Sequence, residues 1–123
     1  MGSETGVGPV LVVEDDESLR RSFVAVLHSV GFDVREAADG FVALETLKAV
    51  PIAAVVLDLG MPVLDGFALL DKLDDPPPIV VVTGHLYDDN VVRRRDKIFG
   101  FVRKPVPPQT LIDIVGDAMR TRT

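Results

Sequence analysis

The sequence has no cysteine, which excludes disulfide bonds, thiolate metal sites and thiol nucleophiles. A bound metal ion would have to be held by oxygen atoms or by histidine. Long apolar runs are also missing, since Val10–Val13 and Ile79–Val82 are far shorter than the ~20 residues of a membrane-spanning helix. No basic segment followed by an apolar stretch suggests export. We therefore expect a cytoplasmic protein with no membrane partner.

Positive charge is scarce as well, with 13 Lys and Arg against 19 Asp and Glu and a formal net charge of −6. Binding to nucleic acid depends on a basic surface that releases counterions from the phosphates. We therefore expect no direct nucleic-acid partner. Nucleotide-binding motifs are missing too, because there is no P-loop lysine motif and Gly6-Val7-Gly8 precedes a strand pattern instead of following one.

The length and composition are those of one globular domain, with 123 residues of which 47% are hydrophobic and 26% charged. Residues 1–8 are small, polar and rich in glycine. We expect them to form a disordered tail or to be a remnant of expression. The folded domain is then expected over residues 9–120.

Short β-branched runs alternate with helical patterns along the chain. The expected strands are Val10–Val13, Val34–Ala37, Ala54–Leu57, Ile79–Val82 and Gly100–Arg103. The expected helices cover about Leu19–Val30, Phe41–Ala49, Gly66–Leu73, Asp88–Lys97 and Gln109–Arg120, with Phe23, Phe41 and Phe67 as core candidates. Strands that are apolar on both faces suit a parallel sheet covered by helices on each side. The pattern predicts a doubly wound α/β domain.

Polar side chains follow four of these strands directly. They are Glu14, Asp15 and Asp16 after the first strand, Asp58 after the third, Thr83 after the fourth and Lys104 after the fifth. In open α/β sheets the ligand crevice lies at the carboxyl ends of the strands. Carboxylates that meet there repel one another unless a cation lies between them. Mg²⁺ suits such a site because it needs only one or two carboxylates, and Mn²⁺, which favours the same oxygen ligands, can substitute for it.

Phosphoryl transfer to a carboxylate is the chemistry that this set of residues fits. Asp58 would be the nucleophile, because carboxylates form aspartyl phosphates in other phosphotransfer systems. The charge on the phosphoryl oxygens must then be neutralised, and the metal ion, the Lys104 ammonium and the Thr83 hydroxyl can share that task. Asp16 is assigned instead to the start of the first helix, where a negative charge is favourable.

Four segments carry a resemblance to a known family: VLVVEDDESLRR, VVLDLGMPVLDGFALL, VVVTGH and FVRKP. They occur in the order and spacing of response-regulator receiver domains, which the sequence resembles over about residues 9–120. The resemblance implies a flavodoxin-like, five-stranded parallel sheet in the order 2-1-3-4-5 with helices on both faces. It also implies a two-component or phosphorelay switch that accepts a phosphoryl group from the phosphohistidine of a histidine kinase or phosphotransfer protein, and that is not an enzyme acting on a metabolite.

The resemblance implies a metal site made by four residues. Glu14 and Asp15 match the acidic pair of the family, and Asp58 matches its phosphoacceptor. The backbone carbonyl of Gly60 matches the third protein ligand of Mg²⁺. Glu14 would then act mainly through a coordinated water molecule.

The remaining matches concern the phosphoryl group and the switch. Lys104 matches the phosphate-contacting lysine, Thr83 the switch hydroxyl and Phe101 the switch aromatic residue. The Lys104–Pro105 peptide bond matches one that is cis in the family, which an X–Pro bond tolerates. Together with Asp58, Lys104 and Thr83 would catalyse the self-phosphorylation.

The family would signal through its fourth helix, fifth strand and fifth helix, here expected over Asp88–Lys97, Gly100–Arg103 and Gln109–Arg120. An unknown output partner, or a second copy in a phosphorylation-dependent dimer, would contact that surface. Asp88–Lys97 departs from the family, because Lys97 replaces a common glycine and only two of its residues are apolar. We expect weak packing there. The run Arg93–Arg95 is either a solvated face or a docking surface for an acidic partner.

Two other functions are weighed against the switch. A phosphatase of the haloacid-dehalogenase type also uses an aspartate nucleophile with Mg²⁺, but it needs a second aspartate two residues later, where this sequence has Gly60. A receiver-shaped scaffold that binds partners without phosphorylation would lack the acidic pair or the lysine, and both are present here. Whether the chain is a stand-alone regulator or a piece of a larger regulator or hybrid kinase stays open.

Overall fold

Five parallel strands form a single sheet in the order β2-β1-β3-β4-β5 in the computed structural model, which describes residues 8–120. The strands are β1 (Val10–Val13), β2 (Val34–Ala37), β3 (Ala54–Leu57), β4 (Ile79–Thr83) and β5 (Gly100–Arg103). The fold class, the strand order and the bounds of four strands are as predicted, and β4 extends one residue further, to Thr83. Because Thr83 is still part of the strand, its backbone position is fixed by the sheet.

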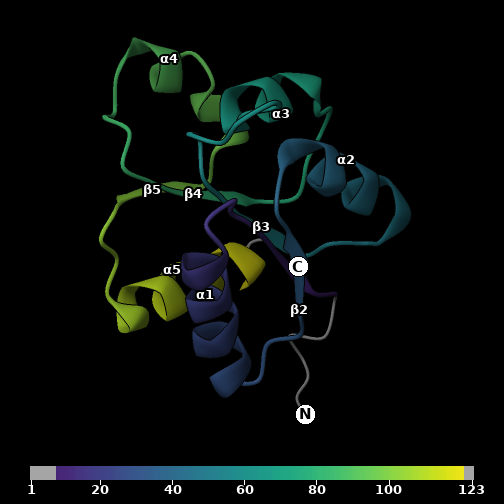
Figure 1. The fold of residues 1–123 in the computed structure, drawn as a ribbon, viewed down its shortest axis with the longest axis vertical. Coiled ribbons are helices and arrows are strands. Elements are labelled where there is room, and N and C mark those ends of the chain that lie inside the picture. The colour runs from purple at the N-terminus through teal and green to yellow at the C-terminus, as the bar shows by residue number, and fades with distance from the viewer. Residues whose placement is uncertain (1–7, 121–123) are drawn as a thin grey trace.

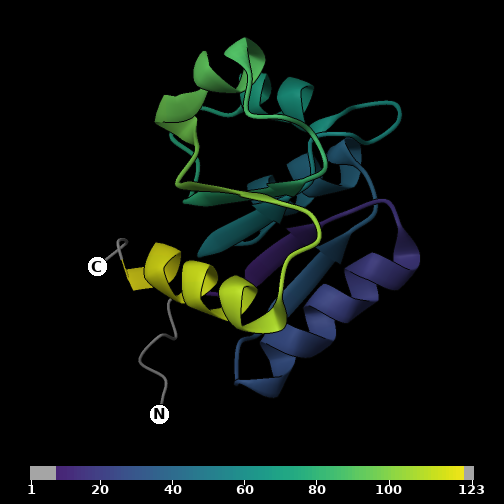
Figure 2. The ribbon, with the colours of Figure 1, turned by 90° about the vertical axis from the view of Figure 1, so that its left-hand side faces the viewer.

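Helices cover both faces of the sheet (Figure 1), and the side view in Figure 2 shows the same layers. The longer helices are α1 (Glu17–Ser29), α2 (Gly40–Ala49), α3 (Gly66–Lys72) and α5 (Pro108–Arg120), and a short α4 (Asp89–Val92) precedes a 3₁₀ turn, η2 (Arg95–Lys97). Helices α1 and α5 lie on one face, and α2, α3 and α4 lie on the other. The sheet is therefore doubly wound, and its carboxyl edge is left open between the two layers.

The core has two layers because successive strand residues point to opposite faces of the sheet. One layer, under α2, α3 and α4, includes Leu11, Val13, Val55, Leu57, Ile79 and Val81. The other, under α1 and α5, includes Val10, Val12, Ala54, Val56, Val80 and Val82. Burial of both faces explains why these strands contain no polar residue until the chain reaches the carboxyl edge.

An aspartate caps the start of each of the first four helices. Asp16, Asp39, Asp65 and Asp88 accept hydrogen bonds from backbone N–H groups of the first turn of α1, α2, α3 and α4. These bonds satisfy donors that have no partner within the helix. The assignment of Asp16 to the first helix is confirmed. Gly31 follows α1 with φ of 97°, a conformation that favours glycine.

The predicted helix over Asp88–Lys97 is wrong in its length. The segment forms the four-residue α4, then a break, and then η2. Val91 is the only fully buried side chain in the segment, so no apolar stripe holds a longer helix to the sheet. Phe41 is a second correction, because its side chain is 53% exposed at the start of α2 and is not a core residue.

Most of the expected tail, residues 1–7, lies outside the described residues. Gly8, which we expected in the tail, packs against the segment that precedes β3. A Cβ added to Gly8 would come within 2.4 Å of the Pro51 carbonyl oxygen. Within residues 8–120, no helix has both the length and the apolar character needed to cross a membrane.

Candidate functional site at the carboxyl edge of the sheet

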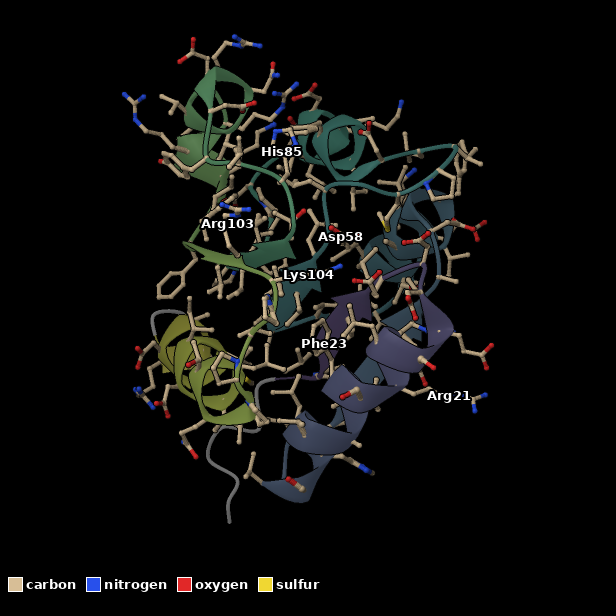
Figure 3. All side chains as sticks on the ribbon, turned by 60° about the vertical axis from the view of Figure 1, so that its left-hand side comes forward. Arg21, Phe23, Asp58, His85, Arg103 and Lys104 are labelled. Atoms are coloured by element: carbon tan, nitrogen blue, oxygen red, sulfur yellow. The ribbon has the colours of Figure 1, made fainter. Side chains whose placement is uncertain are left out.

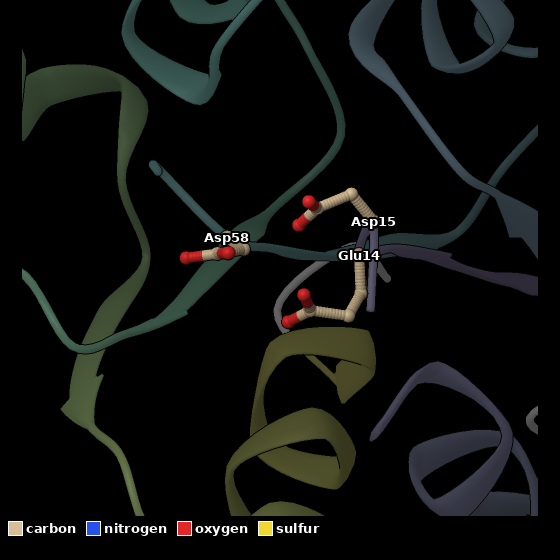
Figure 4. A group of neighbouring side chains, drawn as sticks. All are labelled: Glu14, Asp15 and Asp58. Atoms are coloured by element: carbon tan, nitrogen blue, oxygen red, sulfur yellow. The ribbon is translucent and has the colours of Figure 1, made fainter. Parts of the chain in front are cut away.

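The carboxyl edge of the sheet brings together the polar residues that follow β1, β3, β4 and β5. β3 pairs with both β1 and β4, so Glu14 and Asp58 leave neighbouring strands at the same level. Figure 3 shows Asp58 and Lys104 close together at this edge, and Figure 4 shows Glu14 and Asp15 beside Asp58. The sequence therefore placed these residues at the correct edge of the sheet.

Three carboxylates form a cluster at this edge. One oxygen of each of Glu14, Asp15 and Asp58 lies within 4.8 Å of the others. Glu14 and Asp58 are buried, whereas Asp15 is exposed. Like charges at this separation repel strongly, which a divalent cation relieves. A donor set of hard oxygen atoms with an open side fits Mg²⁺, which keeps several of its waters.

The hydrogen bonds of the cluster distinguish Glu14 from Asp15. Both oxygens of Glu14 are in use, because Oε1 lies 2.8 Å from Lys104 Nζ and Oε2 accepts a bond of 3.1 Å from the Asp16 backbone N–H. Within residues 8–120, no hydrogen bond or ion pair to the Asp15 carboxylate is found. Asp15 is thus free to bind a cation directly, while the geometry of Glu14 suits a role through a water molecule.

Lys104 joins the two buried carboxylates. Its ammonium nitrogen lies 2.8 Å from Glu14 Oε1 and 3.4 Å from Asp58 Oδ2. The peptide bond that follows it, Lys104–Pro105, is cis. The backbone N–H of Lys104 also donates to the Thr83 carbonyl oxygen at 2.8 Å, so the end of β5 is tied to the end of β4.

Burial and charge shift the pKa values of the Glu14–Lys104 pair. Burial raises the pKa of Glu14 above its usual 4.5, and repulsion from Asp58 adds to this, whereas the hydrogen bond from Lys104 opposes it. Burial alone would lower the pKa of Lys104, but the hydrogen bond to Glu14 and the charge of Asp58 outweigh it and raise the pKa above 10.5. Lys104 therefore remains a cation across the physiological pH range.

The loop after Asp58 is held close to the helix that follows it. The Gly60 N–H donates to Asp58 Oδ1 at 3.3 Å, and the Gly66 N–H donates to the Leu59 carbonyl at 3.0 Å. A Cβ on Gly66 would come within 2.5 Å of the Asp58 carbonyl oxygen. The first residue of α3 must therefore be glycine for the helix to pack this tightly against the Asp58 backbone. Gly60 itself is exposed.

Thr83 is buried at the end of β4, and its hydroxyl is already engaged. Thr83 Oγ1 accepts a hydrogen bond of 3.2 Å from the backbone N–H of His85. The hydroxyl hydrogen remains able to donate to another group. Phe101 pairs with Val81 two residues before Thr83, so both side chains lie on the face that α4 covers.

Three residues in or near the site have roles that the sequence did not reveal. Tyr87 meets the half-buried Phe101 edge to face, with ring centroids 5.1 Å apart. Arg20 of α1 donates to the Glu14 carbonyl at 3.0 Å and to Glu36 at 2.9 Å. His85 contacts α3 and the start of α4. Of these three residues, only His85 could have been suspected from the sequence, because it lies two residues after Thr83.

Residues 10–116 match the family of the response regulator receiver domain. With the sheet order and the acidic edge described above, this match shows that the chain belongs to the receiver domains of response regulators. The family predicted from the four sequence segments is confirmed.

The proteins similar to this chain include a transcriptional regulatory protein and a sensor kinase. The transcriptional regulatory protein FixJ of Bradyrhizobium diazoefficiens is 37% identical over 121 residues, covering 94% of this chain and 58% of FixJ. The sensor kinase CckA of Brucella abortus is 34% identical over 122 residues, covering 94% of this chain and 13% of CckA. The chain thus spans less than two thirds of these relatives. A receiver domain protein from Methanospirillum hungatei has the same fold, with a TM-score of 0.87 at 23% identity over 94% of this chain and 96% of that one.

Proposed function

We propose that this receiver domain is the phosphoacceptor of a two-component or phosphorelay pathway and that Asp58 takes the phosphoryl group. The observation that carries the proposal is the buried Asp58 carboxylate, with two other carboxylates within 4.8 Å and the Lys104 ammonium at 3.4 Å. Such a cluster is unfavourable for folding, and a purely structural site would be better served by neutral groups. The arrangement suits a nucleophile that reacts with an anionic phosphoryl group.

Asp15, Asp58 and the Gly60 carbonyl would hold Mg²⁺, or Mn²⁺ in its place, and Glu14 would contribute through water. The bound ion would supply neutralisation of the negative charge on the phosphoryl oxygens. The fit rests on the Asp15 carboxylate, which has no partner within residues 8–120, and on the exposure of Gly60.

The transfer itself uses atoms of this chain. A carboxylate oxygen of Asp58 forms a bond to phosphorus while the phosphorus–nitrogen bond of the donor phosphohistidine breaks, and the electron pair of that bond stays on the imidazole nitrogen. The Lys104 ammonium and the Thr83 hydroxyl each donate a hydrogen bond to a phosphoryl oxygen. The donor is a histidine kinase or a phosphotransfer protein, and the chain modifies itself without turning over a metabolite.

The signal would leave through α4, β5 and α5. When Thr83 moves toward the phosphoryl group it vacates space that Phe101 can enter, and the sparsely packed segment 88–97 is the part whose alternatives lie closest in free energy. Hydrogen exchange should therefore change most in residues 83–104 and least in α1, apart from the loops of the site. An output partner, or a second copy of the chain in a phosphorylation-dependent dimer, would recognise the changed surface.

The test is to incubate the protein with a small phosphodonor and Mg²⁺ and to measure its intact mass. We expect one phosphoryl group on the wild type and none on Asp58→Asn. The control Asp74→Asn changes an exposed acid beyond the end of α3 and should be labelled as the wild type is. Equal labelling of Asp58→Asn would overturn the assignment.

A further inference from the structure

His85 makes three contacts that connect the site with α3 and α4. Figure 3 shows where His85 lies relative to Asp58 and Lys104. Its backbone N–H donates to Thr83 Oγ1 at 3.2 Å, and its ring atom Nε2 lies 3.0 Å from Asp88 Oδ2. The ring also meets Phe67 of α3 edge to face, with centroids 5.1 Å apart and an angle of 77° between the planes. One residue thus contacts the buried hydroxyl of the site, α3 and the residue that caps α4.

Asp88 connects His85 to α4, because its carboxylate contacts both. Its Oδ1 accepts hydrogen bonds from the backbone N–H groups of Asn90, at 3.0 Å, and Val91, at 3.3 Å. Its Oδ2 is the atom that contacts His85. One carboxylate therefore holds the first turn of α4 with one oxygen and the β4–α4 loop with the other, so a shift of His85 must shift the first turn or break the contact.

The turn after α4 is also linked to His85, through Phe67 of α3. The Arg94 guanidinium lies 4.9 Å from the centroid of the Phe67 ring and forms two hydrogen bonds with Asp71 of α3, of 2.8 and 2.9 Å. Phe67 therefore contacts His85 and Arg94 at once. The start of α4 is therefore linked to His85 through Asp88, and the turn after α4 is linked to it through Arg94 and Phe67.

Apolar burial does little to fix this segment. Val91 is its one fully buried side chain, while Arg93 and Arg95 are exposed. The position of α4 must therefore depend strongly on polar contacts, which are those of Asp88 and Arg94 and the bond from Lys97 to the Leu70 carbonyl. This makes α4 responsive to small displacements at those points.

We propose that His85 is a positioning residue that transmits the movement of Thr83 to α4 through its contact with Asp88. The inference rests on the proposed function, because it needs Thr83 to respond to a phosphoryl group on Asp58. His85 takes no part in the transfer itself. Loss of its contact with Asp88 leaves phosphorylation intact and separates the site from α4.

Two variants remove the contact in different ways. Asp88→Ser keeps a side chain that caps helices well but lacks the second oxygen that meets His85. His85→Leu keeps an apolar group against Phe67 but removes Nε2. The matched control is His28→Leu, which replaces the other histidine of the chain, an exposed residue of α1.

The experiment measures two quantities in each protein: the mass added by a small phosphodonor with Mg²⁺, and the change in hydrogen exchange of residues 88–97 on adding beryllofluoride with Mg²⁺. We expect equal labelling throughout. The exchange response of residues 88–97 should fall to less than half of the wild-type value in Asp88→Ser and His85→Leu, while residues 58–66 respond as in the wild type and His28→Leu shows the full response.

The double variant should lose no more of the response than either single variant, because both act on one contact. A full response of residues 88–97 in Asp88→Ser and His85→Leu would overturn the proposal. Loss of labelling in these variants would also overturn it, since it would place His85 in the transfer reaction. Failure of the wild type to be labelled would instead refute the proposed function, so the two failures are distinguishable.

Discussion

The ammonium nitrogen of Lys104 lies 2.8 Å from Glu14 Oε1, and this ion pair connects the end of β5 to the end of β1 across the sheet edge. Lys104 is therefore held beside Asp58 before any phosphoryl group is present. A phosphoryl group on Asp58 would compete with Glu14 for the same ammonium. In this account, phosphorylation replaces one partner of Lys104 with another and frees a carboxylate next to the metal site.

The stability of the unphosphorylated protein should depend on this ion pair. Lys104→Met leaves the Glu14 carboxylate, which is 1% exposed, without its cation. Breaking a fully buried pair costs 3–5 kcal/mol, and because the Lys104 side chain is 23% exposed we expect about 2–3 kcal/mol here. Urea denaturation at pH 7 measures the loss. In the double variant with Glu14→Gln the stranded charge is gone, and at least half of the loss should be recovered; no recovery would argue against the pairing.

Removal of Asp15 should separate metal binding from folding. Asp15→Asn takes away one of three clustered carboxylates, so the metal-free protein should gain about 1 kcal/mol in free energy of unfolding. Its affinity for Mg²⁺, measured by calorimetry, should fall about tenfold or more. The control Asp16→Asn changes the neighbouring acid but keeps a good helix cap, and it should bind Mg²⁺ as the wild type does. An unchanged affinity in Asp15→Asn would contradict the proposed site.

The contact of Gly66 with the Asp58 backbone predicts a change in both stability and labelling. In Gly66→Ala the new Cβ would lie 2.5 Å from the Asp58 carbonyl oxygen, so the backbone must move. We expect a loss of about 1–3 kcal/mol and slower labelling by a phosphodonor. Gly84→Ala is the matched control, because an added Cβ meets nothing within 4 Å there. If both variants behave alike, the tight contact at α3 does not position Asp58.

The Arg94–Asp71 pair predicts a pH dependence of stability. The hydrogen bond from Arg94 lowers the pKa of Asp71 below its usual 3.8. Because the folded-state pKa is the lower one, the stabilisation is present above about pH 3.8 and is lost as the pH falls through the folded-state value. Since the Asp71 side chain is 55% exposed, Asp71→Asn should cost no more than about 1 kcal/mol at pH 7.

Urea denaturation of the wild type and of Asp71→Asn over a series of acidic pH values measures this difference. The two proteins should converge in stability as Asp71 becomes protonated. The control Lys72→Gln changes an exposed neighbour on α3 and should keep a constant difference from the wild type. A difference for Asp71→Asn that grows toward low pH would have the wrong sign for this ion pair.

The three central strands, β1, β3 and β4, and the site edge could be predicted because these strands are buried on both faces. Residues such as Val10–Val13 are apolar on both faces, so their burial between two helix layers follows, and the first polar residue after each marks the open edge. The strand order came from the resemblance to the family, since local patterns do not say which strands pair.

The contacts above the site could not be predicted because they depend on how loops bring distant side chains together. Lys97 illustrates this: the residue that replaces a common family glycine donates from Nζ to the Leu70 carbonyl of α3 at 2.9 Å. Arg94 likewise binds Asp71 of α3, so this member of the arginine run is not simply a solvated side chain. That the run docks an acidic partner stays a prediction. Sequence patterns treat such charged residues as exposed, and here they hold a segment that apolar burial does not.

The central claim is that the phosphoryl group is attached to Asp58, and the most direct test is to locate it. Borohydride reduces an aspartyl phosphate to a homoserine side chain, which peptide mass spectrometry can assign to one position. After treatment with a phosphodonor and Mg²⁺, the account predicts reduction at residue 58 alone. Reduction at Asp15 or at any other carboxylate, or a phosphorylated protein with residue 58 unchanged, would contradict it.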